Sequence, residues 1–415
     1  MSTVLDEFKV AKGWNELPFR AVAQKVSEIG FPELDSLSVF LDAGVVPRSS
    51  REDNHNQLGE SLDKYQRVMP NDLVFNKLRT WQGGFGISNY EGIVSPAYII
   101  ARPDRSLVEP RFLGYLLKSK PYLAELTRLS KWMPPSQFDI SWESIRGLKL
   151  RIPPIEEQQR IADFLDVHLK KIDKAIELKK ILRDAIFDSY NSYRHQLVTG
   201  FKESPKVKSN LDWIPEVPQS WLKLPLRALF SWHKGKDPAR LDNSYCESNP
   251  GEYPVYSGQT GNSGVFGLIN SFDFSFVDKC TLVSTVGAQA GTMRIVSGQF
   301  SLSQNCALLI PKSSSSNAAY LYYLWPSIWS SMKSKIPSDM QPSLRLSDLS
   351  DTWLFLPPAH EQKEIIKLLT KQEEGLNATD AALDDSLLKL EELKVSLITS
   401  AVTGTRDDLF GRGVA

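Results

Sequence analysis

The sequence predicts an α+β protein built as two copies of one unit, each a domain of mixed strands and helices followed by a long helix. Three observations predict it. A proline-led helical segment occurs twice at one offset, a short motif opens each copy, and the intervening regions are rich in short β-type runs. We expect the two long helices to pack against each other as an antiparallel coiled coil.

The first observation is a repeat. RIPPIEEQQRIADFL begins at Arg151, and FLPPAHEQKEIIKLL begins at Phe355. Pro153 and Pro357 lie 204 residues apart, and the segments keep this register to HQLVTG and SAVTG. A period of this length indicates domain duplication rather than a solenoid. In the second copy, Ala and His replace the Ile and Glu that follow the proline pair in the first.

Both repeated segments have the pattern of amphipathic helices. A proline pair and then glutamate suit a helix N-terminus, and Gly200 and Gly404 suit its C-terminal end. Each helix would be about 65 Å long. The apolar positions predicted to pair the helices, or to dock partners, are Ile161, Leu165, Ile172, Ile176, Leu369, Leu376, Leu383, Leu387 and Leu390. The alternative is two unrelated helices, each packed on its own domain.

The second observation concerns where each copy begins. Trp14, Leu17 and Pro18 recur as Trp221, Leu224 and Pro225. The regions that follow contain DLVFNK, CTLVSTVG and similar strand-type runs with glycine turns. The predicted domain organisation is a first domain (1–150), a first helix (151–200), a linker (201–212), a second domain (213–354), a second helix (355–404) and a tail (405–415).

Composition sets broad limits on the class of protein. A chain of 415 residues exceeds one typical core. Its three cysteines, an odd number, show no metal-type pairing, so we expect a reducing cytoplasm and no disulfide framework. No apolar run is long enough for a bilayer, and no signal peptide opens the chain, so we expect no membrane association. The formal net charge of zero neither indicates nor excludes nucleic acid.

Catalytic signatures are not found in the sequence. WQGGFGIS is not a dinucleotide fingerprint, no Walker-type lysine loop occurs, and the five histidines have no zinc-ligand spacing. No Asp/Asn-Pro-Pro-aromatic motif of an adenine methyltransferase appears. We therefore expect no catalytic residue, no metal site and no cofactor in this chain.

Polar loops that contain glycine are the candidate binding sites. Their Arg, Lys, Asn, Gln, Ser and Thr side chains are the types that read base edges and hold phosphates. The alternative is ordinary surface turns. The candidate DNA-binding residues are Asn76, Lys77, Arg79, Thr80, Trp81, Gln82, Tyr256, Ser257, Gln259, Thr260, Gln289, Arg294, Ser303 and Gln304.

This arrangement resembles the DNA-specificity subunit of type I restriction–modification enzymes over nearly the whole chain. The resemblance rests on the two Pro-Pro-x-x-Glu-Gln helix starts, on HQLVTG and SAVTG, and on the domain stretches NDLVFNKLRTWQGGFGISNYEGIVSPAY and YPVYSGQTGNSGVFG. It implies that each domain is a target-recognition domain for one half of a split, asymmetric double-stranded DNA sequence. The paired helices would space these domains and dock two methyltransferase subunits.

The same resemblance implies that motor–nuclease subunits join the complex for cleavage. It implies that S-adenosylmethionine, ATP and Mg are bound by the partner subunits and not by this chain. Two rival hypotheses remain from the residues themselves. One is a helical scaffold that binds polypeptides without recognising DNA, and the other is an enzyme that uses the glycine-rich clefts for a sugar or another ligand.

Overall fold

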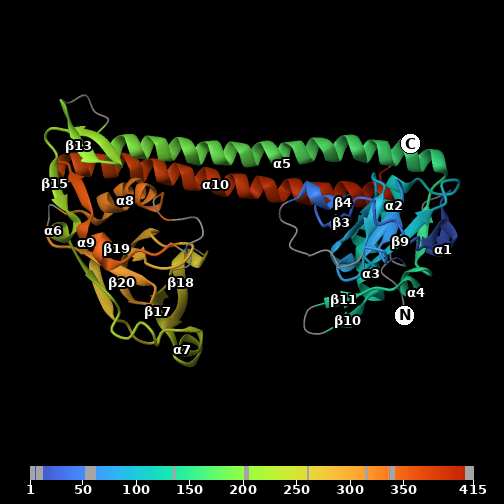
Figure 1. Cartoon of the computed structure of the whole chain (residues 1–415), viewed down its shortest axis with the longest axis horizontal. Helices are drawn as coiled ribbons and strands as arrows, with labels where there is room; N and C mark the ends of the chain where they lie inside the picture. Colours follow the sequence, from blue (N-terminus) through green and yellow to red (C-terminus); the bar gives the residue numbers. More distant parts are fainter. Residues whose placement is uncertain are drawn as a thin grey trace. The chain divides into compact units, whose positions relative to one another are not determined.

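The computed structural model describes residue 5 and residues 13–51, 62–133, 137–200, 205–258, 261–313, 316–334, 336 and 342–406 (Figure 1). The chain divides into two compact units. Unit 1 consists of residues 1–180 and 383–415, and unit 2 consists of residues 181–382. Each unit therefore contains one part of each long helix.

Unit 1 contains short strands arranged in small sheets. The largest sheet has four strands in the order β2-β9-β6-β7, and four further pairs are β1–β12, β3–β4, β5–β8 and β10–β11. The strands are β1 (Asn15–Pro18), β2 (Ala23–Val26), β3 (Leu37–Phe40), β4 (Gly44–Pro47), β5 (Gln66–Val68), β6 (Leu73–Asn76), β7 (Phe85–Ile87), β8 (Gly92–Val94), β9 (Tyr98–Pro103), β10 (Lys131–Met133), β11 (Gln137–Asp139) and β12 (Lys149–Ile152).

Helices of unit 1 cover the sheet and enclose its main core. Phe75 and Phe85 from the sheet are fully buried with Phe112 from α2. Fully burying one such side chain contributes about 1.5–3 kcal/mol. The helices are α1 (Phe19–Val22), α2 (Pro110–Lys118), α3 (Lys120–Leu129), α4 (Trp142–Ile145) and the long α5 (Ile155–Val198), with 3-10 turns η2 (Arg48–Ser50) and η3 (Thr80–Gln82).

Unit 2 is built around one larger sheet of six strands, in the order β16-β21-β19-β20-β17-β18, with separate pairs β13–β14 and β15–β22. Its strands are β13 (Lys206–Leu211), β14 (Ile214–Pro218), β15 (Leu222–Pro225), β16 (Phe230–His233), β17 (Pro250–Tyr256), β18 (Val265–Ile269), β19 (Phe274–Ser284), β20 (Met293–Leu302), β21 (Cys306–Pro311) and β22 (Trp353–Leu356).

One helix of unit 2, α8, packs against β19 and β20 (Figure 1). It buries Tyr320 and Trp325 almost completely. The helices of this unit are α6 (Leu226–Leu229), α7 (Asn243–Ser248), α8 (Ala318–Lys333), α9 (Leu346–Asp351) and the long α10 (Ala359–Val402), with a 3-10 turn η4 (Gly261–Gly264).

The two long helices confirm the predicted fold class. Each has 44 residues, and both begin at the residue directly after a proline pair. In unit 1, Asp173 of α5 pairs with Lys394 of α10 at 2.6 Å, and Phe164 of α5 lies under Arg406, just beyond α10. In unit 2, Arg183 pairs with Asp380 at 2.5 Å. Within unit 1, residue numbers rise along one helix as they fall along the other, so the helices run antiparallel.

Each helix start is held by a buried glutamine from the repeated motif. Gln158 donates to the carbonyl of Pro153 at 2.8 Å, and Gln362 donates to the carbonyl of Pro357 at 2.9 Å. Both side chains are nearly inaccessible to solvent. Because a buried amide without partners is costly, these bonds explain why glutamine occupies the same place in both copies.

Both helix ends have the predicted glycine. Gly200 adopts φ of +82° and Gly404 φ of +72°, which lie in the left-handed region that glycine tolerates. At Gly200 a Cβ atom would also lie 2.3 Å from the ring of Pro218. Pro218 ends the hairpin β13–β14, whose first strand lies in the stretch expected to be a linker (201–212). Ile214 and Val217 are buried in the core of unit 2, so this hairpin belongs to the domain.

Candidate functional site

The end of β6 and the loop after it carry six of the predicted residues, and the loop is held by its own hydrogen bonds. The Thr80 hydroxyl donates to the carbonyl of Asn76 at 2.7 Å, and the Trp81 indole nitrogen donates to the carbonyl of Leu78 at 3.1 Å. The Asn76 side chain accepts from the amide of Leu78 at 3.1 Å. Thr80 is fully buried, so its hydroxyl shapes the loop and is not displayed at the surface.

Other side chains of this loop are displayed. Arg79 and Gln82 are exposed. Lys77 donates to the carbonyl of Pro96 at 2.8 Å, which holds its ammonium group beside the loop. The loop therefore presents a guanidinium and an amide on a backbone that is already ordered, which lowers the entropy cost of binding.

A hairpin next to this loop was not identified from the sequence. Phe138 of β11 lies between two tryptophans, with ring centroids 5.0 Å from Trp81 and 4.8 Å from Trp132 of β10. The Trp132 side chain is 49% exposed. The backbone of Ile140 also donates to the carbonyl of Lys77 at 3.2 Å. The available signal was the stretch KWM (131–133), which is followed by another proline pair at 134–135. This stretch lies far from Trp81 in the sequence, so the sequence alone did not indicate their proximity.

A cavity of about 350 Å³ opens beside Lys77. Lys25, Lys64 and Lys77 line it, with Asp139 as the carboxylate among its lining residues. Tyr98 also lines it, and burial raises the pKa of this phenol, so Tyr98 is neutral at pH 7. An excess of ammonium groups in a concave site attracts anions.

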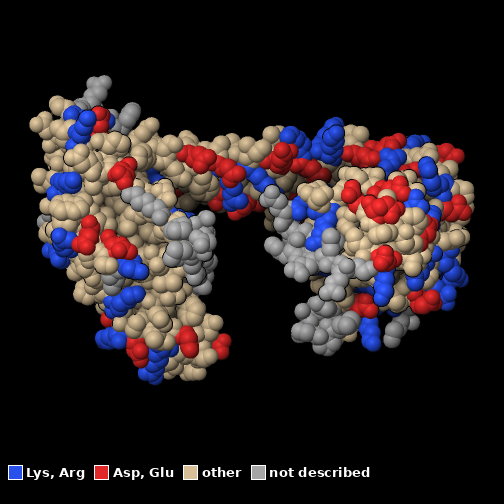
Figure 2. All heavy atoms as spheres, in the orientation of Figure 1, with Lys and Arg blue, Asp and Glu red and all other residues tan. Residues whose placement is uncertain are grey.

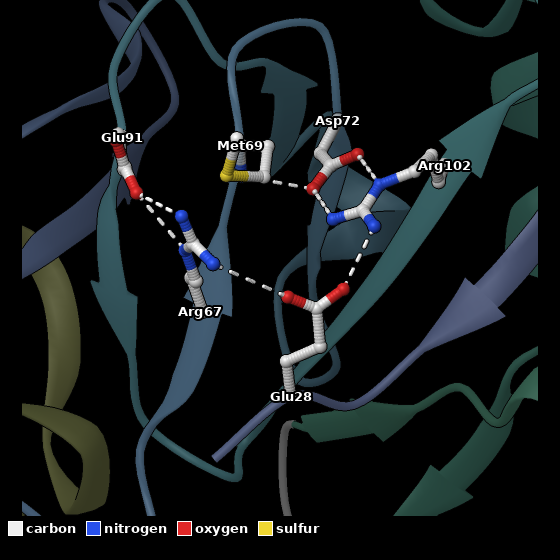
Figure 3. A network of polar contacts seen from close by, with 6 residues as sticks. All are labelled: Glu28, Arg67, Met69, Asp72, Glu91 and Arg102. Atoms are coloured by element: carbon white, nitrogen blue, oxygen red, sulfur yellow. Dashed lines mark hydrogen bonds and ion pairs between the residues drawn. The ribbon is translucent and has the colours of Figure 1, made fainter. Parts of the chain in front are cut away.

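At the end of β6 and β9 opposite to this loop, a network of ion pairs joins the two strands (Figure 3). Arg102 of β9 binds both oxygens of Asp72 at 2.9 Å and also reaches Glu28 at 2.8 Å. Asp72, almost fully buried, accepts a further bond from the amide of Met69. The hydrogen bonds to Asp72 raise the pKa of Arg102 despite partial burial. Removing one partner would leave a buried charge uncompensated, so this network anchors β6 and β9.

In unit 2, the structure brings together several predicted residues from separate strands. Arg294 of β20 donates to the carbonyl of Ser257 at 3.2 Å, and the amide of Ser303 donates to the carbonyl of Tyr256 at 2.9 Å. Gly264 lies directly against this guanidinium with φ of +78°, and a Cβ atom there would lie 2.6 Å from it. Ser257 and Ser303 are largely buried, so their backbones hold Arg294 and Tyr256 in place.

Lys234 adds a cation that the sequence did not indicate. Its ammonium group donates to the carbonyl of Gln304 at 2.9 Å, and burial lowers the pKa of Lys234. Gln304 itself is exposed. Gln289 is exposed in the turn between β19 and β20, where it lies 3.4 Å from the hydroxyl of Thr292. Gln259 and Thr260 lie outside the described residues.

The predicted helix-pairing residues occupy three kinds of place. In unit 1, Leu387 and Leu390 of α10 pack against the core that contains the predicted residues of α5. Those residues of α5 are Ile161, Leu165, Ile172 and Ile176. Leu369 is fully buried in the core of unit 2, and Leu383 is buried. Leu376 is partly exposed and lines a cavity of about 540 Å³ with Tyr190 and Gly375.

Over the described residues, no helix is both long enough and apolar enough to span a bilayer. In the same part of the chain, no group of three or more His, Cys, Asp or Glu side chains is placed to hold a metal ion. Lys, Arg, Asp and Glu are intermingled on the long helices (Figure 2).

Comparison with known proteins gives a consistent result. The family described as the type I restriction modification DNA specificity domain matches residues 26–183 and again residues 218–387. A type I specificity subunit of Mycoplasma pneumoniae is 31% identical over 148 residues, which are 35% of this chain and 45% of that protein. The chain thus spans less than half the length of this relative.

A longer match is the specificity subunit of the MjaX type I restriction enzyme of Methanocaldococcus jannaschii. It is 25% identical over 334 residues, covering 75% of this chain and 73% of that protein. Among solved structures, a chain of a type I R-M system aligns with TM-score 0.70 at 17% identity, over 95% of this chain and 99% of that one. The HsdS subunit of Thermoanaerobacter tengcongensis aligns with TM-score 0.52 at 16% identity, over 97% and 100%. At these identities the two structures bear on the fold alone.

Proposed function

Because this chain belongs to the type I restriction–modification DNA specificity family, we propose that it is the subunit that reads the DNA target of such a system. Each domain would read one half of a bipartite, asymmetric double-stranded sequence. The chain would act without a catalytic residue of its own, as the recognition part of a methyltransferase or endonuclease complex.

The observation that carries this proposal is one scaffold used twice with different loops. β1 pairs with β12 in unit 1 as β15 pairs with β22 in unit 2, and a 44-residue helix follows each pair. The candidate binding loops of the two units differ entirely. Unit 1 has WQGG after β6, and unit 2 has the residues Tyr256, Arg294 and Gln304. The two domains share the same strand pair and the same following helix but carry different loops. This arrangement fits a DNA target whose two halves have different sequences.

Cationic and aromatic groups at the first loop support contact with DNA. Arg79 can form a bidentate pair with guanine, and Lys77 with its two neighbouring lysines can approach backbone phosphates. The exposed Trp132 offers a ring for contact with bases or sugars. With a net charge of zero, the chain alone would bind DNA weakly, and partner subunits would supply further basic surface.

The long helices would dock two methyltransferase subunits. Large apolar side chains that remain exposed on the helices support this, since they are available to form an apolar partner contact. On the unit 1 part of the helices, four of them are 50–60% exposed: Val167, Leu178, Leu388 and Leu393. Motor–nuclease subunits would join for cleavage, and S-adenosylmethionine, ATP and Mg would bind to the partner subunits in the cytoplasm.

The test uses the chain expressed with its cognate methyltransferase subunit in cells that lack other adenine methylation. Methylome sequencing should show one asymmetric motif made of two short parts separated by an unread gap. Omission of this chain should abolish the methylation. An uninterrupted motif, or methylation that persists without the chain, would overturn the proposal.

A further inference from the structure

A second cavity, in unit 2, lies where the end of α5 meets α8. Its volume is about 500 Å³. From α5 it is lined by Arg194 and His195 with two small polar residues. From α8 and its C-cap it is lined by four serines and Pro326, and Trp213 completes the lining. The polar lining side chains besides Arg194 and His195 are those of Asn191, Ser192, Ser327, Ser330, Ser331 and Ser334. No carboxylate is among them.

Arg194 is the distinctive group of this cavity. It is only 8% exposed, yet it forms no ion pair with any Asp or Glu of the described chain. Its guanidinium donates to the carbonyl of Tyr323 at 3.0 Å, and its hydrogen bond to the Asn191 amide oxygen is long at 3.4 Å. A guanidinium has five N–H donors, so two neutral acceptors leave it capable of binding an anion. Desolvation of its charge is costly until an anion is present.

Part of the role of Arg194 is structural. Pro326 lies inside α8 and cannot contribute a backbone donor to the helix. Arg194 bonds to the carbonyl of Tyr323 in the same turn. A neutral donor would satisfy this carbonyl equally well, so the bond does not by itself explain a buried full charge.

The repeat shows that the fold does not need a cation here. At the repeat offset, Arg194 and His195 of α5 correspond to Ile398 and Thr399 of α10. Ile398 is buried in the apolar core of unit 1, and Thr399 accepts a backbone hydrogen bond from Lys120. The same helix end is thus packed with an apolar residue in one copy and with arginine in the other. The charge in unit 2 serves something other than packing.

The surrounding donors favour an oxyanion with several acceptor atoms. The His195 Nδ1 lies 3.0 Å from the hydroxyl of Ser327. Partial burial and the Arg194 charge lower the pKa of His195, so the ring is neutral at pH 7 and keeps one N–H donor. Ser327, Ser330, Ser331 and Ser334 recur at the spacing of one helix face. Hydroxyls, an imidazole and a guanidinium together match the oxygen atoms of a tetrahedral anion better than the two of a carboxylate.

We propose that this cavity is a phosphate-binding site, with Arg194 as its cationic ligand and with His195 and the serines of α8 as neutral donors. The phosphate would come either from a free phosphate compound or from the DNA backbone. The site is separate from the sequence-reading loops and does not depend on them.

The test measures the Tm of the full chain in complex with its methyltransferase partner. Phosphate, acetate and chloride are compared at equal ionic strength and pH. We expect a saturable rise in Tm with phosphate and none with acetate or chloride, because a ligand that binds only the folded state stabilises it. An equal response to acetate, or to chloride, would overturn the proposal.

Two variants address the residues. Ser330→Asp places a carboxylate at the rim of the cavity; it should abolish the phosphate response while leaving the Tm in chloride at or above that of the wild type. Arg194→Met keeps much of the side-chain volume and should also abolish the response. Arg160→Met, which removes an exposed guanidinium of α5, is the control and should retain it. A phosphate response that survives in Ser330→Asp disproves the site even if Arg194→Met does not fold.

DNA binding distinguishes the two sources of phosphate. If the DNA backbone supplies the group, Arg194→Met should reduce the slope of log K against log salt by about one. If the slope is unchanged while the Tm response is lost, the ligand is a free phosphate compound.

Discussion

The indole nitrogen of Trp14 donates a hydrogen bond to a carboxylate oxygen of Glu157 at 3.0 Å, across 143 residues of sequence. Trp221 and Glu361 form the same bond at 3.2 Å in the other unit. In both copies, the residue that opens the domain is tied to the first turn of the long helix that ends it. The carboxylate also lies where a helix N-terminus favours negative charge.

This bond predicts a graded loss of stability. Glu157→Ala removes the carboxylate that accepts from the largely buried Trp14 nitrogen and should lower the free energy of unfolding by about 1–3 kcal/mol. Glu157→Gln keeps an acceptor oxygen and should cost less than half of that. Urea denaturation of the three proteins measures the difference. Equal losses for the Ala and Gln variants would show that the bond has no such role.

The pairing of the helices in unit 1 predicts a contrast between two residues of α5. Leu165 is fully buried against the apolar core, while Val167, two residues later, is 51% exposed. Leu165→Ala should cost about 2–5 kcal/mol, because it removes buried methyl groups and leaves a cavity. Val167→Ala should stay within about 0.5 kcal/mol. If the two variants have the same thermal midpoint, the packing described for α5 is wrong.

The loop after β6 predicts a separation of stability from DNA binding, if it reads DNA as proposed. Arg79→Ala removes an exposed guanidinium and should weaken specific binding by about 1–3 kcal/mol without changing the Tm. Thr80→Val removes the buried bond to Asn76 and should cost about 0.5–1.5 kcal/mol of stability, with the target sequence unchanged. Electrophoretic mobility shifts with the partner complex and thermal melts provide both readouts. If Thr80→Val relaxed the specificity for the target sequence while Arg79→Ala had no effect on DNA binding, the roles of the two residues would be reversed.

A structural feature of this molecule is predictable from the sequence when the contacts that form it lie close together along the chain. The long helices follow from periodicity, proline pairs and terminal glycines, all of which lie within one segment. The strand β13 is not predicted, because proline, serine and lysine in and before it have the composition of a linker. Its structure depends on Ile214 and Val217 reaching a core formed by distant residues.

The candidate sites show the same limit more strongly. Thr80 has a polar side chain suited to DNA, and only the structure shows it buried beneath the loop. Phe138 joins the loop through a ring contact with Trp81, far away in the sequence, and Trp132 in turn contacts Phe138. Lys234 meets Gln304 only because the strands of unit 2 bring them together. Residue type thus predicts a chemistry for the loops, while tertiary contacts decide which of their side chains are exposed.

Independent reading by the two domains predicts the result of an exchange. Residues 19–148 can be replaced by the equivalent segment of a relative, which leaves β1, β12 and the Trp14–Glu157 bond of the host in place. One half of the methylated motif should change, while the other half and the gap stay the same. Reinsertion of the original segment is the control. A change in both halves would show that the domains do not read separately.

Both long helices pass from one unit into the other, α5 after Lys180 and α10 after Ala382. If the helix pair spaces the two readers, its length should determine the unread gap. Seven residues added to each helix at these points lengthen it by about 10 Å. Two turns of 3.6 residues nearly equal seven, so each helix face stays within about 20° of its former direction.

Because DNA advances about 3.4 Å per base pair, the double insertion should widen the gap by about three base pairs and keep both half-sites. Heptads copied from the adjoining turns preserve the apolar stripe, so the protein should fold and support methylation. Insertion into α5 alone is the matched control; it shifts the register against α10 and should reduce both stability and methylation. Methylome sequencing of cells that carry each variant with the cognate methyltransferase reads the gap directly. If the double insertion is active and methylates the original gap, the helices do not set the spacing and serve as a docking surface only.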